Sequence, residues 1–199
     1  MKKPIVMNRT KSLILLCALA LLLAGSCDSL KGLTAEEKAS RYVDKLMTEF
    51  RNGTMEGIHC PDVQWVHIPA LLEYAKSTEV IGHDITSGES SMMTIPTNPL
   101  SSYMMTQCLE GTFALWMVEA ARQHSLPASA RRKDYFGWPS LNPIILPQDG
   151  STSSTSWSVC DVETHQAVLA AYLKWWEQAG GDQSAASINP LEGTGYRWQ

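Results

Sequence analysis

The chain has 199 residues, of which 44% are apolar and 18% are charged. This length is enough for about one domain, and the composition excludes collagen-like, coiled-coil and wholly disordered chains. The formal net charge of −4 is unevenly spread, because four basic residues lie in the first eleven positions and no acidic residue precedes Asp28. From residue 27 onward the chain carries 12 basic and 20 acidic side chains, a net charge of −8. Such an acidic chain binds polyanions poorly, so no nucleic-acid partner is expected.

The amino-terminal segment has the features of an export signal. Residues 13–23 form an unbroken run of eleven apolar residues behind a basic stretch. A membrane-spanning helix needs about 20 such residues, so a secretory signal peptide fits this run and a permanent transmembrane helix does not. Either Met1 or Met7 can be the start, because both leave a basic segment ahead of the run.

The five residues 23–27, LAGSC, resemble the lipobox of bacterial lipoproteins. In that pattern small residues precede a cysteine that is acylated and becomes the first residue of the mature protein. This chain departs from it mildly, since Ala24 stands where Leu is usual and Leu23 lies one position earlier. The alternative is an ordinary secretory signal cleaved near Ala24 or Ser26, which would leave Cys27 as a thiol.

The lipobox resemblance implies a division of the chain and a location. Residues 1–26 would be a lipoprotein signal peptide, residues 27–33 a tether, and residues 34–199 a single helical domain. Cys27 would be the lipidation site, and its acyl chains would hold the protein to a lipid bilayer. The expected location is the bacterial cell envelope, with the outer membrane favoured over the inner.

The remaining cysteines allow several arrangements. With Cys17 removed and Cys27 acylated, an oxidising compartment would contain Cys60, Cys108 and Cys160. Three is an odd number, so at most one internal disulfide can form, and the spacings do not select the pair. Those spacings match no zinc pattern either.

Two helices are predicted in the first half of the domain. A capping-box pattern at residues 34–37 starts the first helix, and one apolar stripe continues it to Gly53. Pro69 suits the first turn of a short second helix over residues 70–76.

Two further helices are predicted in the second half. Residues 106–124 are apolar on nearly every side, which is typical of a central, buried helix. Asp161 can cap a last helix that runs to residue 178 and ends at Gly180-Gly181.

Long ordered loops are predicted between these helices. Residues 81–99 and 125–158 are rich in Gly, Pro, Ser and Thr, with one extended piece expected at 92–95. Asn-Pro followed by Leu or Ile recurs at residues 98–100, 142–144 and 189–191. This recurrence fits either a short HEAT-like helical-repeat stack or turns that Asn-Pro simply starts. The expected fold class is mainly α, a small helical domain with long ordered loops.

Catalytic and metal-binding motifs are scarce. The sequence has no nucleophile elbow, nucleotide-binding glycine loop or zinc-protease motif. His59, Cys60, Asp62 and His67 are metal-binding types within nine residues, but neighbours in an extended segment point to opposite faces. A turn with two half-exposed histidines is therefore favoured over a metal site, and no metal or cofactor is predicted.

Two pairs of residues have side chains of catalytic types. Cys160 and His165 flank a predicted helix start, but residues five apart on a helix do not stack. Glu110 and Glu119 could pair as glycosidase acids only if they met in a cleft. Glu119 and Arg122, three apart, are interpreted as a surface ion pair. No catalytic residue is assigned.

Aromatic residues outside the helices are the candidate binding residues. They are Tyr135, Trp138, Trp157, Tyr196 and Trp198. Loop aromatics often build platforms for sugars or peptides. The alternative is that they complete the core of a domain with few helices.

Several segments together resemble a family of small uncharacterised lipoproteins of Gram-negative bacteria. They are the lipobox-like start, IPALLEYAKSTEVI, IPTNPLSSY, LEGTFALWMVEAAR and the closing NPLEGTGYRW. The resemblance covers roughly residues 65–124 and the tail. It implies a helical domain of unknown function and carries over no catalytic residue.

Two functions from different classes are consistent with these observations. The favoured one is a membrane-anchored binding or accessory module that presents its loops to a protein or glycan ligand. The other is an envelope-associated hydrolase acting on a polysaccharide or peptide. The hydrolase requires convergent acids, or a histidine beside Asp or Glu, in a cleft.

Overall fold

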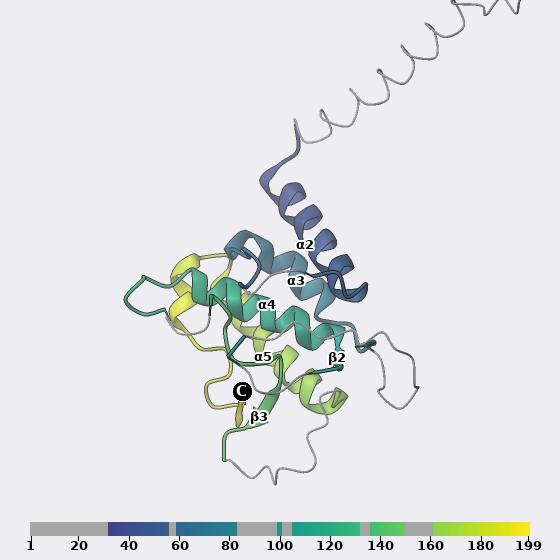
Figure 1. Cartoon of the computed structure of the whole chain (residues 1–199). Helices are drawn as coiled ribbons and strands as arrows, with labels where there is room; N and C mark the ends of the chain where they lie inside the picture. The colour runs from purple at the N-terminus through teal and green to yellow at the C-terminus, as the bar shows by residue number, and fades with distance from the viewer. Residues whose placement is uncertain (1–31, 56–58, 83–98, 101–104, 132–135, 150–160) are drawn as a thin grey trace, which may run out of the picture. The chain divides into compact units, whose positions relative to one another are not determined.

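The computed structural model describes residues 32–55, 59–82, 99–100, 105–131, 136–149 and 161–199 (Figure 1). The chain divides into two compact units, Met1–Lys38 and Ala39–Gln199. No helix within the described residues is long and apolar enough to cross a membrane.

The prediction of a mainly α fold is confirmed. The described residues form four α-helices, which are α2 (Ala35–Arg51), α3 (Ile68–Tyr74), α4 (Glu110–His124) and α5 (Val162–Ala179). The same residues also form two short 3-10 helices, η1 (Trp65–His67) and η3 (Gln183–Ser187). These elements do not show a HEAT-like repeat. The two Asn-Pro segments that can be compared differ, because Asn142 is buried whereas Asn189 is exposed and folds into a local turn.

The helix ends follow from local side-chain chemistry. At the start of α2 the Thr34 backbone N–H donates to the Glu37 carboxylate at 2.7 Å, and the Glu37 N–H donates to the Thr34 hydroxyl at 3.2 Å. This is the reciprocal capping box that the sequence predicts. At the start of α5 the Asp161 carboxylate accepts hydrogen bonds from the backbone of Glu163 and Thr164. Gly180 ends α5 in a left-handed conformation, with φ of 55°, that a side chain would disfavour.

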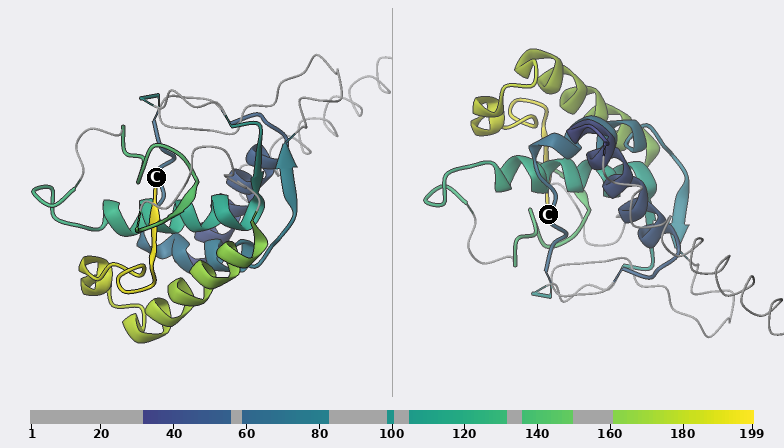
Figure 2. Two further views of the ribbon diagram at one scale, coloured as in Figure 1. Left: turned by 90° about the horizontal axis from the view of Figure 1, so that it is seen from below. Right: turned by 90° about the horizontal axis from the view of Figure 1, so that it is seen from above.

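Helix α4 is the centre of the Ala39–Gln199 unit. Every residue from 110 to 122 is buried, as its all-round apolar sequence predicts. α4 packs against α3 and α5, and both views of Figure 2 show α5 running beside it. Phe113 of α4 stacks on Phe50 of α2 with ring centroids 3.9 Å apart.

Within the part of the chain that the structure describes, four short strands form two separate antiparallel pairs. Strand β1 (Val80–Gly82) pairs with β2 (Gln107–Leu109), which leads directly into α4. Strand β3 (Ile145–Pro147) pairs with β4 (Tyr196–Trp198) near the end of the chain. Strand β3 lies within the predicted loop 125–158, because its three residues form a strand only through pairing with a partner about fifty positions away. The expected extended piece at 92–95 lies outside the described residues.

His165 of α5 joins three helices inside the core. Its Nε2 lies 3.0 Å from the Ala75 carbonyl oxygen, just after α3, and its Nδ1 lies 3.1 Å from the Thr112 hydroxyl of α4. A carbonyl can only accept, so Nε2 carries the proton and Nδ1 accepts from Thr112. The adjacent Gly111 allows this approach, because a Cβ there would lie 2.5 Å from the same carbonyl oxygen and 2.7 Å from the His165 ring.

We expect the domain to lose stability as the pH falls below about 6.5, because His165 is buried in its neutral form. Burial lowers the pKa of His165 below its ordinary value of 6.5, and the hydrogen bond to Ala75 offsets this only partly. The unfolded chain therefore takes up a proton at a pH where the folded chain does not. The free energy of unfolding then decreases from about pH 6.5 down to the folded-state pKa.

Urea unfolding of the full chain in mild detergent, from about pH 7.5 to about pH 5, measures this slope. The variant His165→Gln should have a shallower slope. It will not be flat, because burial also lowers the pKa of His67 and that residue contributes in the same pH range. Equal slopes for the parent and the variant would contradict the assignment.

Candidate functional site

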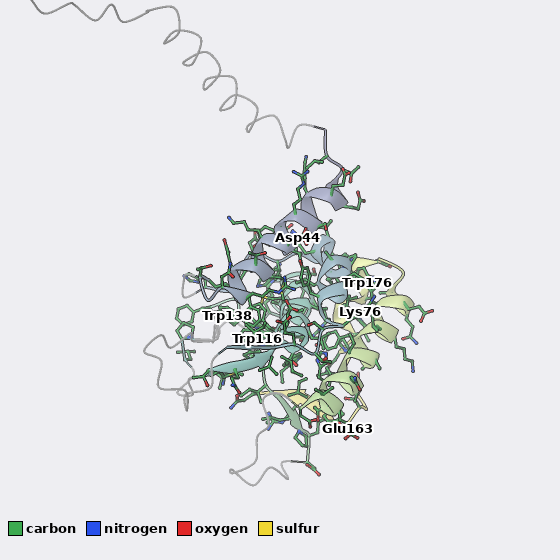
Figure 3. All side chains as sticks on the ribbon, turned by 90° about the vertical axis from the view of Figure 1, so that its right-hand side faces the viewer. Asp44, Lys76, Trp116, Trp138, Glu163 and Trp176 are labelled. Carbon is green, nitrogen blue, oxygen red and sulfur yellow. The ribbon has the colours of Figure 1, made fainter. Side chains whose placement is uncertain are left out.

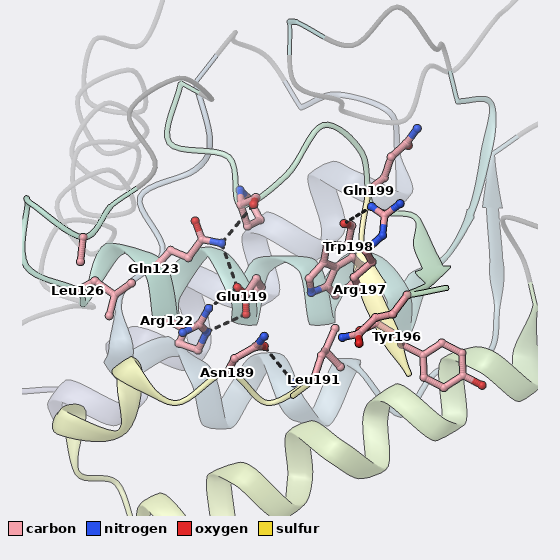
Figure 4. A pocket seen from close by; sticks show the side chains of 13 residues that line it. Glu119, Arg122, Gln123, Leu126, Asn189, Leu191, Tyr196, Arg197, Trp198 and Gln199 are labelled. Carbon is pink, nitrogen blue, oxygen red and sulfur yellow. Dashed lines mark hydrogen bonds and ion pairs between the residues drawn. The ribbon is translucent and has the colours of Figure 1, made fainter. Parts of the chain in front are cut away.

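The candidate site is a pocket of about 470 Å³, here called the C-terminal pocket. Helix α4 and the turn after it form one side, and the tail that contains β4 forms the other (Figure 4). The lining residues are Glu119, Arg122, Gln123, Leu126, Ala130, Pro139, Gln148, Asn189, Leu191, Tyr196, Arg197, Trp198 and Gln199. This volume lies within the usual range for small-ligand sites, about 300 to 1,000 Å³.

The carboxylate of Glu119 is the polar centre of the pocket wall. One oxygen accepts from Arg122 Nη2 at 2.6 Å and from Gln123 Nε2 at 2.9 Å. The other accepts from Arg122 Nε at 2.9 Å and from the Tyr172 hydroxyl at 2.7 Å. Each oxygen thus receives two hydrogen bonds, which is the full capacity of an ionised carboxylate.

The pair of Glu119 and Arg122 is buried, which corrects its interpretation as a surface pair. The two side chains are only 5% and 10% exposed. Arg122 also donates to the carbonyl oxygen of Ala186 at 2.6 Å, and so holds η3 against α4. The sequence indicates this burial, because both residues lie in the helix that is predicted to be buried on nearly every side.

The network continues from Glu119 to the tail. Tyr172 of α5 is completely buried, and burial together with the negative charge of Glu119 raises its pKa well above the ordinary value. Its hydroxyl therefore stays protonated and donates to Glu119. The same oxygen accepts the indole N–H of Trp198 at 2.9 Å, which fixes the position of that ring in the pocket wall.

Of the predicted aromatic binding residues, Tyr196 and Trp198 line this pocket. Both are half-buried, although Figure 4 shows the Tyr196 ring extending away from Glu119 and Arg122. Trp138 belongs to the core instead. It is only 3% exposed and stacks on Trp116 at a centroid distance of 4.7 Å (Figure 3). Tyr135 and Trp157 lie outside the described residues.

The cysteines and histidines considered for chemistry do not converge where they are described. The described residues contain no group of three or more His, Cys, Asp or Glu side chains placed to hold a metal ion. His67 accepts a hydrogen bond from the Gln64 backbone N–H at 2.8 Å and stacks on Tyr42. Burial raises the pKa of the Cys60 thiol, which keeps it protonated. Cys160 lies outside the described residues, and Cys60 forms no disulfide.

The two acids considered as a glycosidase pair are each bound to an arginine. Glu119 is paired with Arg122, as described above. Glu110, at the start of α4, lies 2.6 Å from Arg51 of α2. Its side chain is only 2% exposed, so it lines no cleft.

A second pocket, of about 740 Å³, lies beside η1 and the end of α4. Most of its polar groups already hold the surrounding loops together. Both ring nitrogens of His124 lie about 3 Å from carbonyl oxygens, those of Val63 and Gly137. Trp65 donates to the Gly181 carbonyl at 2.9 Å, and Arg131 is bound to a carbonyl within its own loop. We therefore place the candidate site at the smaller C-terminal pocket.

The fold and this pocket define a small helical domain with a polar pocket. A family model described as a domain of unknown function, DUF4943, matches residues 34–199, and the chain belongs to that family. This agrees with the resemblance to an uncharacterised domain family that the sequence segments indicated. No curated protein and no solved structure matches the chain.

We expect the isosteric variant Glu119→Gln to destabilise the domain by about 3–5 kcal/mol, because it leaves the Arg122 charge buried without its counter-ion. The matched control is Glu49→Gln, which removes the carboxylate of the exposed pair with Lys45. That change should alter the free energy of unfolding by less than about 0.5 kcal/mol. Urea unfolding at neutral pH measures both. Similar small effects for the two variants would show that Glu119 does not hold the domain together.

Proposed function

We propose that the protein is a binding module of the bacterial cell envelope, anchored to a membrane through acylated Cys27, with the C-terminal pocket as its ligand site. The anchor part of the proposal rests on the apolar run and the lipobox-like residues 23–27. The ligand is a protein or a glycan of the envelope.

The observation that supports a binding role is that the Glu119 carboxylate in the pocket wall is fully hydrogen-bonded to other protein side chains. Glu119 is the one carboxylate among the described lining residues, and all of its hydrogen-bonding capacity is used by Arg122, Gln123 and Tyr172. A carboxylate held in this way positions the wall of the pocket and has no hydrogen-bonding capacity left for a substrate. The lining also offers a ligand the half-buried Trp198 ring, neutral amide groups and the exposed Arg197 side chain.

An envelope-associated hydrolase acting on a polysaccharide or peptide was the alternative. It needs a general acid or base that can reach a substrate. Glu119 makes all of its hydrogen bonds within the pocket wall, so it gives the hydrolase no specific support. The binding role is therefore the function that we propose.

We expect Cys27→Ala to abolish incorporation of palmitate and to move the protein out of the membrane fraction, because the acyl chains would have no attachment point. Metabolic labelling with palmitate followed by membrane fractionation measures both effects. The control is Cys60→Ala, which removes a cysteine of the folded unit and should leave labelling unchanged. Undiminished labelling of Cys27→Ala would disprove the anchor.

We expect Ala130→Trp to reduce ligand binding at least tenfold, because it places a large ring at an exposed position of the pocket lining. The matched control is Ala170→Trp on the exposed face of α5, outside the C-terminal pocket. The full chain in detergent is immobilised and offered separate polysaccharide and protein fractions of the envelope. Retention that is equal for the parent and Ala130→Trp would contradict the pocket as the ligand site.

A further inference from the structure

Four carboxamide side chains line the C-terminal pocket, and each is only half used by the fold. Gln123 and Gln148 donate through Nε2, to Glu119 and to the Tyr196 carbonyl oxygen at 2.9 and 3.1 Å. Gln199 accepts through Oε1 from Asn142 at 2.7 Å, and Asn189 accepts through Oδ1 from the Leu191 N–H at 3.0 Å. The structure therefore fixes one end of each amide group.

The other ends have no protein partner among the described residues. These are two acceptors, Oε1 of Gln123 and of Gln148, and two donors, Nδ2 of Asn189 and Nε2 of Gln199. Because the bound end orients each amide group, the unused end is held in place before a ligand arrives. Preorganisation of this kind reduces the entropy lost on binding.

From this pattern we infer that the C-terminal pocket binds a saccharide. This inference rests on the proposed binding function and names the class of its ligand. A sugar hydroxyl both donates and accepts, so a saccharide can bond to free carbonyl oxygens and to free amide nitrogens alike. The apolar face of a sugar ring can pack on Trp198, whose indole is fixed by its hydrogen bond to Tyr172.

Charge and hydrogen bonding both disfavour other ligand classes. The charges of Glu119 and Arg122 compensate each other within the wall, and Arg197 is the remaining charged lining residue described. Among the described lining side chains, a cationic ligand would therefore meet no unpaired carboxylate, and an anionic ligand would meet Arg197 alone. An apolar peptide segment would remove the four free amide ends from water without replacing their hydrogen bonds, and each such loss weakens binding.

The test uses the full chain in mild detergent on an array of defined oligosaccharides, followed by calorimetric titration of the saccharides that bind. Gln148→Met removes one free acceptor, and Asn189→Ser removes one free donor while keeping a side-chain oxygen for the local turn. Each variant should weaken binding about three- to tenfold, and the double variant more. Gln166→Met, an exposed glutamine on α5 outside the pocket, is the matched control and should bind as the parent does. Thermal unfolding of each variant verifies that it is folded.

The outcomes separate this inference from the proposed function. A bound saccharide whose affinity is unchanged in both pocket variants would overturn the inference. So would binding to no saccharide on the array combined with a protein ligand that Ala130→Trp blocks, although the binding function would then stand. If no saccharide binds and Ala130→Trp affects no ligand, both the inference and the proposed function are wrong.

Discussion

The carboxylate of Glu119 lies inside the domain, and an ionised group in such a place must be compensated by charge and hydrogen bonds. Its partners come from different parts of the chain. Arg122 and Gln123 follow it on α4, and Tyr172 comes from α5. Arg122 in turn holds η3, and Tyr172 holds the tail through Trp198. The arrangement of the carboxyl-terminal half therefore depends on this one buried charge.

The same compensation determines the character of the C-terminal pocket. Because Glu119 and Arg122 bind each other, they form a wall of the pocket, and most of the other lining residues are uncharged. The tail that Trp198 fixes brings Gln199 to the pocket, and the segment after η3 brings Asn189. The saccharide site that we propose and the structural role of the charged pair thus rest on a single network.

Much of the helical framework could be predicted because its causes are local. The capping box at Thr34, the Asp161 cap and the left-handed Gly180 depend on a few neighbouring residues, and each is found where the sequence predicts it. The burial of α4 could also be predicted, since an all-round apolar helix has no solvent-facing side. Strand β3 could not, because its pairing with β4 depends on a segment far away in the chain.

The sequence by itself determined the mainly α class and the local caps at Thr34, Asp161 and Gly180. The export-type start with its lipobox-like residues stays a prediction from the sequence. The sequence also shows that four basic residues lie within the first eleven positions, whereas every acidic residue follows position 27. Only the tertiary structure decided which polar residues meet. In the folded chain Trp138 lies in the core against Trp116, and the pair of Glu119 and Arg122 is buried. Four amide side chains from separate segments line one pocket. The physical reason is that caps and helical periodicity act over a few residues, whereas hydrogen bonds such as that between Trp198 and Tyr172 join positions that only the folded chain brings together.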